Sequence, residues 1–396
     1  MVATLTRVFG VHNLALAEDV VQDAFCRALE VWKFRGMPEN PSAWLMATAK
    51  NRALDVLRRQ RTARTFAPEL GRLIESEWTL APIVEDLFAP NAIKDDLLRM
   101  MFSCCHPRLS EEAQIALILN ILCGFSVDEV GNAFVSSHAA IEKRISRAKK
   151  VLAASKKLFD VTAAAQFSAR LPAVQRTLYL LFNEGYHGAS TESAVRGELC
   201  QEAMRLATLL LEHPLAATPA THALAALMCL DAARLPARVD ASGHLNSLLE
   251  QDRSQWDQEL VVKGLRLLDL SATGSALTEY HVEAAIASIH ARAPSVEDTD
   301  SENIVSLYDT LMAIRPSPVI ALNRAIHIGE RSGPQYGLEA IRAITNPERL
   351  AGYPFYFAAL GKFELESAKY EDAREHFMPP SRSPAIPWSA IFPNSA

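Results

Sequence analysis

Apolar residues recur three and four positions apart along most of the chain, which is the period of amphipathic helices. Stretches in which apolar and polar residues alternate between turn signals, the pattern of half-buried strands, do not occur in the sequence. Alanine and leucine are frequent and glycine is sparse, which also favours helix. We therefore predict an all-α fold. The first apolar face comprises Leu14, Leu16, Val20, Val21, Ala24, Phe25, Ala28, Leu29 and Trp32.

A polar, mostly acidic stripe lies opposite this face, and a second helix follows after a break. The stripe comprises Asp19, Asp23, Cys26 and Glu30. Gly36 and Pro38 end the first pattern, and Asn40 followed by Pro41 predicts an N-cap and a first helical residue. The inward positions of the second helix are Trp44, Ala47, Leu54 and Leu57. Six bases and one acid between Lys50 and Arg64 form a first cationic patch, which by itself is also typical of a solvated surface helix.

A second cationic patch is the most informative feature of the chain. Residues 137–153 form one helical pattern, and between Lys143 and Lys157 there are seven bases and no acids. Ser126 and Glu129 make a capping box for a short helix just before it. Two short helices joined by a tight turn, with the second one basic, are typical of a helix-turn-helix that enters the major groove of DNA.

The position of each residue on this basic helix suggests its role in binding DNA, although most basic runs are simply solvated helix faces. Side chains near the helix N-terminus usually reach base edges, and later cations usually contact phosphates. The candidates for base edges are Ser137, His138, Ala140 and Lys143. The candidates for phosphate contact are Arg144, Arg147 and Lys149.

Charge is distributed unevenly between the two halves of the chain. Residues 1–158 hold 21 Lys and Arg against 18 Asp and Glu, whereas residues 159–396 hold 19 against 28. This asymmetry favours a front half that faces nucleic acid and a rear half with another role. We divide the chain into residues 1–64, an acidic linker at 65–95, a helix-turn-helix unit at 96–158, a helical extension at 159–378 and a disordered tail at 379–396.

The rear half has the texture of repeated amphipathic helices. The expected spans are 171–182, 193–212, 219–235, 251–270, 279–293, 304–314, 318–330, 336–344, 351–366 and 370–377. Residues 358–363 match the small-Leu-Gly centre of a first tetratricopeptide helix, and Ala373 with Phe377 matches the Ala-x3-Phe of a second. Stacked repeats of this kind form a concave surface for a peptide or protein.

Cysteine usage and the lack of apolar runs bear on compartment and cofactors. The six cysteines fall mostly within apolar helical patterns, as buried free thiols in a reducing compartment do. Cys104, Cys105 and His106 are adjacent, but no second pair lies at metal-ligand spacing, so we expect no metal and no cofactor. No stretch approaches a membrane span or a signal peptide. We expect a cytoplasmic protein.

Three ordered motifs resemble the sigma-70 family of RNA polymerase sigma factors. Residues 16–25 (LAEDVVQDAF) resemble regions 2.1–2.2, residues 40–59 resemble regions 2.3–2.4, and residues 126–152 resemble region 4.2. The order is similar to that of extracytoplasmic-function (group IV) factors, and in particular to the subgroup with a tetratricopeptide-like extension. Residues 101–107 (MFSCCHP), 181–186 (LFNEGY) and 251–257 (QDRSQWD) also resemble that subgroup. Within region 4, Val135 stands where glycine is common, and Gly131 stands where alanine is usual.

The resemblance implies partners and site residues. Core RNA polymerase, through its β′ clamp helices and β flap, and promoter DNA would be the partners. Asp19, Gln22 and Asp23 would meet the clamp helices. The residues that melt and read the −10 element would be Trp44, Lys50, Asn51, Arg52, Asp55, Arg58 and Arg59, and the helix from Ser137 would read the −35 element. The linker would thread toward the polymerase active site, and the extension would bind a regulatory protein or peptide.

Three other functions are compatible with parts of the sequence. A helix-turn-helix regulator with a repeat-type sensory half would bind DNA without polymerase. A scaffold would use the repeats alone. An enzyme is disfavoured, because Asn183, Glu184, Tyr186 and His187 are better explained by packing or capping, and the chain has no Gly-rich phosphate loop, His-Glu-x-x-His or Gly-x-Ser-x-Gly motif.

Overall fold

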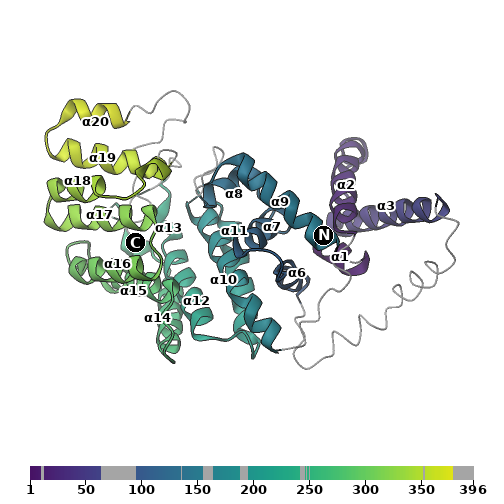
Figure 1. Ribbon diagram of the computed structural model, residues 1–396, viewed down its shortest axis with the longest axis horizontal. Helices are drawn as coiled ribbons and strands as arrows, with labels where there is room; N and C mark the ends of the chain where they lie inside the picture. The colour runs from purple at the N-terminus through teal and green to yellow at the C-terminus, as the bar shows by residue number, and fades with distance from the viewer. Residues whose placement is uncertain are drawn as a thin grey trace. The chain divides into compact units, whose positions relative to one another are not determined.

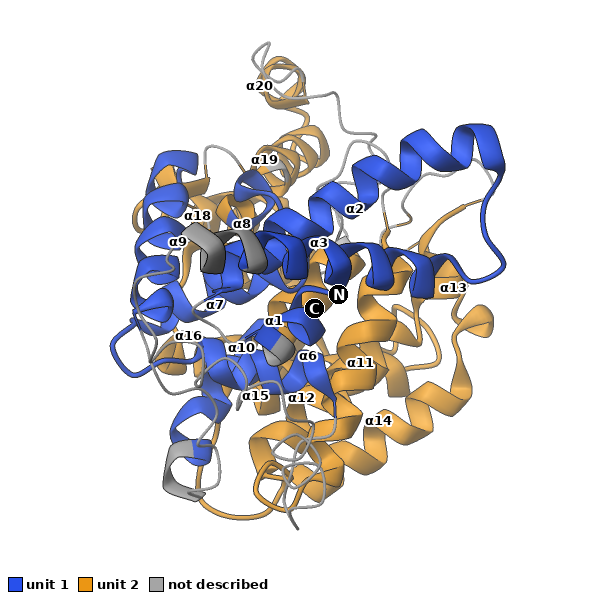
Figure 2. Ribbon diagram, turned by 90° about the vertical axis from the view of Figure 1, so that its right-hand side faces the viewer, with its two compact units in different colours: residues 1–130, 137–177 blue, residues 131–136, 178–396 orange. Residues whose placement is uncertain are grey.

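The computed structural model describes residues 1–9, 13–63, 95–134, 136–154, 164–187, 195–240, 246, 248, 250–350 and 353–377. These residues form helices and turns and no β-strand, which confirms the all-α prediction (Figure 1). Nearly all of the predicted linker (65–95) and the whole predicted tail (379–396) lie outside the described residues. The chain divides into two compact units, residues 1–130 with 137–177 and residues 131–136 with 178–396 (Figure 2).

Unit 1 begins with three helices around one apolar core. They are α1 (Val2–Phe9), α2 (Leu14–Arg35) and α3 (Pro41–Ala63). Asn40 accepts a hydrogen bond from the Ala43 amide at 3.0 Å, so the predicted N-cap is confirmed. Small residues let α2 and α3 approach closely along this core. The buried residues are Leu5, Phe9, Ala17, Val20, Val21, Ala24, Ala28, Leu45, Ala49 and Ala53.

The apolar face of α2 is narrower than its sequence predicts. Phe25 is 49% exposed and Leu29 is 76% exposed, and Ala47 on α3 is also exposed. The prediction that these three residues point inward is wrong, because the buried strip of α2 consists of Leu14, Ala17, Val20, Val21, Ala24 and Ala28. Phe25 and Leu29 therefore lie on the surface of α2, as does Phe34 near its C-terminal end.

The rest of unit 1 is a second group of helices and the first part of α10. The helices are α6 (Asp96–Cys104), α7 (Glu111–Ile121), α8 (Val127–Phe134), α9 (His138–Ala153) and α10 (Ala164–His187), of which α8 from Gly131 and α10 from Leu178 belong to unit 2. Local signals set their starts: Ser110 accepts from the Ala113 amide, and Ser126 and Glu129 form the predicted capping box through two hydrogen bonds of 3.2 and 2.7 Å. α10 packs on α6, where Phe167 stacks on Phe102 with ring centroids 4.4 Å apart.

Unit 2 continues from the end of α10 through helices that pack mainly on their neighbours in sequence. They are α11 (Gly197–Glu212), α12 (Pro219–Ala232), α13 (Leu235–Arg238), α14 (Gln258–Ser271), α15 (Glu279–Arg292), α16 (Ser301–Ile314), α17 (Pro318–Ser332), α18 (Pro334–Arg342), α19 (Pro354–Glu366) and α20 (Tyr370–Phe377). Helices α15 to α20 form a stack in Figure 1, and each contacts the next. Two short 3-10 turns, η2 (Arg253–Gln255) and η3 (Pro347–Leu350), interrupt the series.

Most of the predicted helices in the rear half are present, but one starts late. The helix expected from residue 251 begins at Gln258, because Asp257 caps it by accepting from the amides of Glu259 and Leu260. Helix α19 packs very closely on both α17 and α20. A Cβ atom added at Gly329 would lie 2.3 Å from Cζ of Phe363, and one at Gly361 would lie 2.6 Å from the ring of Phe377.

Candidate nucleic-acid interface

Helix α9 presents a cationic face because its apolar positions anchor it to unit 1. Ile141, Ile145, Ala148 and Leu152 are buried, and α9 packs on α7. The opposite face exposes Ala140, Lys143, Arg147 and Lys150, which follow one another at helical spacing. Sequence reasoning included Lys150 in the basic run but not among the candidate site residues.

Two of the expected phosphate contacts on α9 are instead paired with carboxylates of unit 1. Nη2 of Arg144 lies 2.8 Å from Oε2 of Glu112 on α7. Nζ of Lys149 donates to both carboxylate oxygens of Glu18 on α2, at 2.9 and 3.1 Å. The Glu18–Lys149 pair therefore joins the start of α2 to α9. The exposed cations available to an external partner on this face are Lys143, Arg147 and Lys150.

The N-terminal end of α9 is held by polar contacts with α8. Ser137 precedes the helix in an extended conformation, as an N-cap residue does, but its side chain makes no capping hydrogen bond. Nδ1 of His138 lies 2.6 Å from Oδ1 of Asp128. This hydrogen bond, together with the charge of Asp128, raises the pKa of His138. Ser137 and Ala140 are exposed beside it.

Gly131 is explained by the turn that follows α8. The Ser136 amide donates to the Gly131 carbonyl at 2.8 Å, and a Cβ atom at residue 131 would lie 3.0 Å from the Ser136 carbonyl oxygen. Even alanine would require this turn to shift slightly. Val135 lies outside the described residues.

The first cationic patch of the sequence, between Lys50 and Arg64, lies mostly on α3. Lys50, Asn51, Arg52 and Asp55 are exposed along it. Nε of Arg52 lies 3.1 Å from Oδ2 of Asp23 on α2, so one expected DNA contact is paired with one expected polymerase contact. Arg58 and Arg59 belong to α3, but their side chains lie outside the described residues.

A partly buried aromatic pair fixes the position of Trp44 at the other end of α3. Its ring centroid lies 5.5 Å from that of Trp32 on α2, with the planes tilted by 59°. The Trp44 carbonyl accepts a hydrogen bond from Oγ1 of Thr48. Trp44 therefore takes part in the α2–α3 packing.

The acidic face of α2 is exposed as its spacing predicts. Asp19, Gln22 and Asp23 lie at the surface. Phe25 and Leu29 follow Gln22 by three and seven residues, so they lie on the same side of the helix as Gln22. A polar patch beside two exposed apolar side chains is typical of a protein-docking surface. Sequence reasoning missed this apolar element because it placed both residues in the core.

The described residues offer neither a metal-binding cluster nor a membrane-spanning helix. They contain no group of three or more His, Cys, Asp or Glu residues able to hold a metal ion. Within the same residues, no helix is both long and apolar enough to cross a membrane.

Comparison with known proteins gives two family matches and one full-length relative. Residues 1–63 match Sigma-70 region 2, and residues 170–272 match a family of unknown function (DUF6596). The chain is 38% identical over 368 residues to Uncharacterized protein R00370 of Rhizobium meliloti (strain 1021), which covers 92% of this chain and 85% of that protein. No solved structure matches.

Proposed function

Because the chain belongs to the same family as the Rhizobium meliloti protein R00370 and carries a Sigma-70 region 2 domain, we propose that it is an extracytoplasmic-function sigma factor. It binds core RNA polymerase in the cytoplasm, directs it to promoters and performs no covalent chemistry itself. The observation that carries the proposal is the region 2 match, together with the exposed cationic face of α9 in the same compact unit.

Helices α8 and α9 act in this proposal as the helix-turn-helix of region 4. Ala140 and Lys143 approach the bases of the −35 element, and Arg147 and Lys150 contact its phosphates. The exposed residues of α3 take part in opening the −10 element, where an unpaired base can be held outside the helical stack.

The exposed face of α2 is the polymerase-binding surface in this proposal. Asp19 and Gln22 supply polar contacts to the β′ clamp helices, and Phe25 with Leu29 supplies apolar contact area. Leu29 is a sensitive position because most of its side chain is exposed before docking and would be buried afterwards.

The deciding experiment is transcription in vitro with core polymerase, followed by mapping of start sites. A sigma factor yields defined start sites only when core enzyme is present, and Leu29→Ser weakens its co-purification with core. Leu270→Ser is a matched control, because Leu270 is an exposed leucine in unit 2. A chain that shifts promoter duplex unaided, with a steep salt dependence, and never binds core would be a helix-turn-helix regulator instead.

Unit 2 acts in the same proposal as a tetratricopeptide-like regulatory extension. Its neighbour-to-neighbour packing and the close Gly361–Phe377 contact support this reading. A chain ended after Thr177 keeps Phe167 and Arg170 against Phe102, so α6 retains its cover. Transcription by this shortened chain should differ from that of the full chain, and an unchanged rate on the same promoter would rule out regulation by the extension.

A further inference from the structure

Unit 2 buries two arginines at the end of α12, and their environments differ. Arg238 is fully buried but well accommodated: its Nε donates to the Tyr186 carbonyl at 3.0 Å, and its guanidinium carbon lies 4.0 Å from the centre of the Tyr186 ring. Arg234 is 2% exposed. Its Nε donates to Oε1 of Gln251 at 3.3 Å, but neither Nη1 nor Nη2 has a hydrogen-bond partner in the part of the chain that the structure describes.

Asp231 forms an ion pair with Arg234 but accepts no hydrogen bond from Nη1 or Nη2 of its guanidinium. Oδ1 of Asp231 lies 3.7 Å from Nη1 of Arg234, which is an ion-pair distance but too long for a hydrogen bond. That oxygen also has no hydrogen-bond partner among the described residues. Burial raises the pKa of Asp231 to about 6, against the opposing effect of Arg234 and Arg238. The pair therefore leaves donor and acceptor positions open inside unit 2.

Other unsatisfied donors gather around the same guanidinium. The Arg234 guanidinium carbon lies 5.6 Å from the ring centre of Trp256, and that of Arg253 lies 5.2 Å from it. Nε1 of Trp256 and Nε of Arg253 are buried without a hydrogen-bond partner in the described residues. The hydroxyl of the buried Tyr308 on α16 also has no hydrogen-bond partner among the described residues, and burial raises its pKa, with smaller effects of Glu283 and Asp231.

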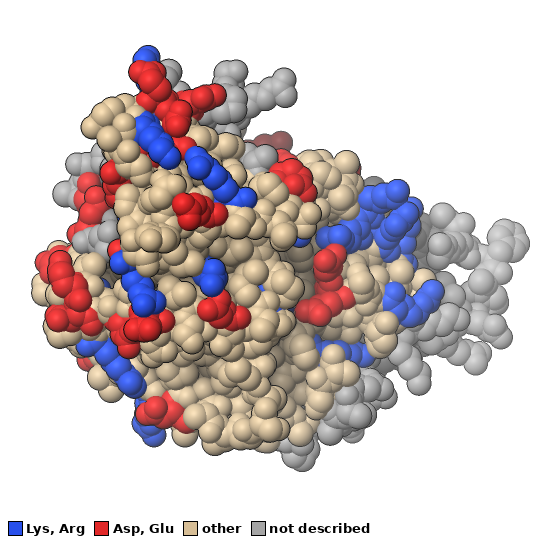
Figure 3. All heavy atoms as spheres, turned by 60° about the vertical axis from the view of Figure 1, so that its left-hand side comes forward, with Lys and Arg blue, Asp and Glu red and all other residues tan. Residues whose placement is uncertain are grey.

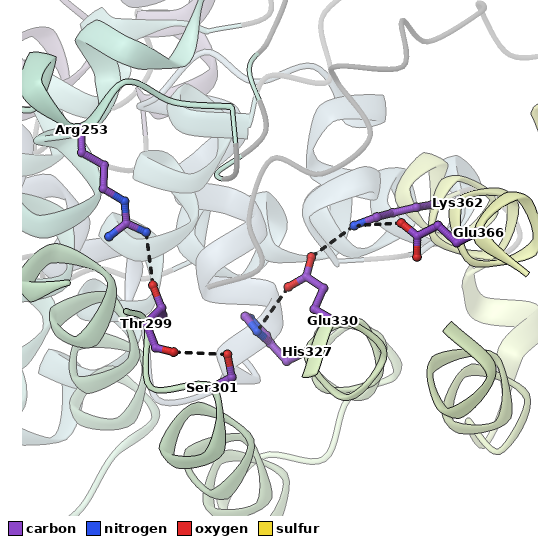
Figure 4. Close-up of polar contacts among 7 residues, drawn as sticks. All are labelled: Arg253, Thr299, Ser301, His327, Glu330, Lys362 and Glu366. Carbon is purple, nitrogen blue, oxygen red and sulfur yellow. Dashed lines mark hydrogen bonds and ion pairs between the residues drawn. The ribbon is translucent and has the colours of Figure 1, made fainter. Parts of the chain in front are cut away.

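Further hydrogen bonds and ring contacts hold several of these side chains in place. Nη1 of Arg253 donates to the carbonyls of His290 and Ala293, and Nη2 donates to Oγ1 of Thr299 at 3.2 Å. Figure 4 shows Arg253 with Thr299 on one side, and His327 with Glu330 and Lys362 on the other. The ring of His327 lies 5.4 Å from that of Tyr308. The unsatisfied atoms are therefore presented by a fixed frame rather than by loose surface chains.

The numbers of unsatisfied donors and acceptors indicate which ligand groups would pair with them. Four N–H-bearing nitrogens, from Arg234, Trp256 and Arg253, face one unsatisfied carboxylate oxygen, so hydrogen-bond acceptors are needed more than donors. Asp231 is the buried carboxyl beside Arg234 and Arg238, and the exposed carboxylates of Glu297 and Asp298 also act on Arg253. A buried donor without a partner costs about 1–3 kcal/mol, and more when it is charged. Water would supply acceptors but no negative charge, whereas an oxyanion supplies both and fits the fork of an arginine.

We propose that unit 2 binds a small molecule bearing an oxyanion group, a carboxylate or a phosphate, between Arg234, Arg253 and Trp256. Nη1 and Nη2 of Arg234 donate to the oxyanion, and Nε1 of Trp256 and Nε of Arg253 complete its acceptor sites. Asp231 accepts from a hydroxyl or amino group of the same molecule. The site uses residues of α12, η2 and the segments beside them, so it does not depend on the role proposed for unit 1.

Full-length protein tests the proposal directly. Native mass spectrometry of freshly purified protein looks for a bound small molecule. Thermal unfolding is then followed with inorganic phosphate, a phosphomonoester (glycerol phosphate), a dicarboxylate (succinate) and an α-amino acid (glutamate) as separate probes. The proposal expects a retained mass that is lost on denaturation, or a midpoint that rises with one probe class. The class that binds distinguishes phosphate from carboxylate recognition.

Three variants decide whether binding occurs at this site. Trp256→Phe keeps an aromatic ring but removes the indole N–H, and Arg234→Met removes the guanidinium group. Each should weaken binding of the active probe, by about threefold to tenfold for Trp256→Phe and about tenfold to a hundredfold for Arg234→Met. Arg205→Met is the matched control, because Arg205 lies on the surface of α11 and pairs with Glu202. It should bind as the original chain does.

Two results would overturn the proposal. One is the absence of both a retained mass and any shift with the four probes. The other is equal binding by the original chain and Trp256→Phe, which would place the ligand elsewhere. If Arg234→Met does not fold, Trp256→Phe still tests whether the ligand binds at this site.

Discussion

The two compact units place their arginines in opposite environments. In unit 1, Arg52 is paired across the surface with Asp23, and both side chains are about half exposed. In unit 2, Arg234 and Arg238 are almost completely buried among aromatic side chains. On the face shown in Figure 3, acidic and basic side chains are interspersed, so unit 2 also carries ordinary surface charge.

An exposed charged side chain can exchange one partner for another, whereas a buried one cannot. An exposed ion pair contributes about 0–1 kcal/mol, so Arg52 can exchange Asp23 for a phosphate at little cost. A buried guanidinium keeps its position because its desolvation must be offset by fixed contacts. The exposed charges of unit 1 are thus suited to a large partner that binds reversibly. The buried charges of unit 2 are suited to a ligand whose groups match their fixed positions.

The largest expected effect is the loss of stability when a buried arginine of unit 2 is replaced. Arg238→Ala removes a fully buried side chain, its hydrogen bond to the Tyr186 carbonyl and its stacking on that ring. We expect it to destabilise unit 2 by about 3 kcal/mol or more, measured by urea unfolding. Arg147→Ala on α9 should change stability by at most about 0.5 kcal/mol. Similar losses in both variants would contradict the contrast.

Close packing in unit 2 provides the next largest effect. Gly329→Ala places a methyl group 2.3 Å from Cζ of Phe363, in contact with the ring that holds α17 against α19. A destabilisation of about 1–3 kcal/mol is expected in thermal or urea unfolding. Gly197→Ala is the matched control, since its Cβ would meet nothing within 4 Å. If Gly329→Ala unfolds at the same midpoint as the control, the packing is looser than described.

The exposed cations of unit 1 should affect DNA binding with little effect on folding. Arg147→Gln should lower the dependence of log K on log salt by about 0.9 for one lost phosphate contact, measured with polymerase-bound protein on promoter DNA. Arg144→Gln, in which the lost charge was paired with Glu112, should lower it less. Equal salt slopes for the two variants would mean that Arg144 leaves Glu112 when DNA binds.

The smallest expected effect concerns pH. The hydrogen bond to Asp128 raises the pKa of His138 above its ordinary value of 6.5. The protonated ring therefore stabilises the folded state below that value, and this contribution disappears as pH rises through the folded-state pKa. An NMR titration of the His138 ring should give a midpoint above 6.5 that returns toward it in Asp128→Asn. A midpoint unaffected by Asp128→Asn would exclude the hydrogen bond as the cause.

Local signals made much of the fold predictable from sequence. Asn40, Ser110 and Ser126 cap helices through their own side chains, and the effect of a cap depends only on the next three residues. Gly124 ends the α7 turn with φ of 76°, which suits glycine. The starts of these helices were therefore predicted well, whereas the start of α14 was missed although Asp257 caps it.

Burial that depends on distant partners was not predictable in the same way. Phe25 and Leu29 have the spacing of core residues, and only the narrow contact with α3 leaves them outside. Arg234 and Arg238 resemble the polar end of an amphipathic helix, but Tyr186, about fifty residues earlier, and Trp256 surround them. The pairing of Lys149 with Glu18 also joins residues far apart in sequence.

If the proposed function holds, the Glu18–Lys149 pair would link two binding events through a single carboxylate. Glu18 lies directly before Asp19, so a protein that attracts Glu18 while docking on α2 also releases Lys149. By thermodynamic reciprocity, DNA that captures Lys149 strengthens that docking by the same factor. Glu18→Gln would remove this cooperativity and leave each half to bind at its own intrinsic affinity.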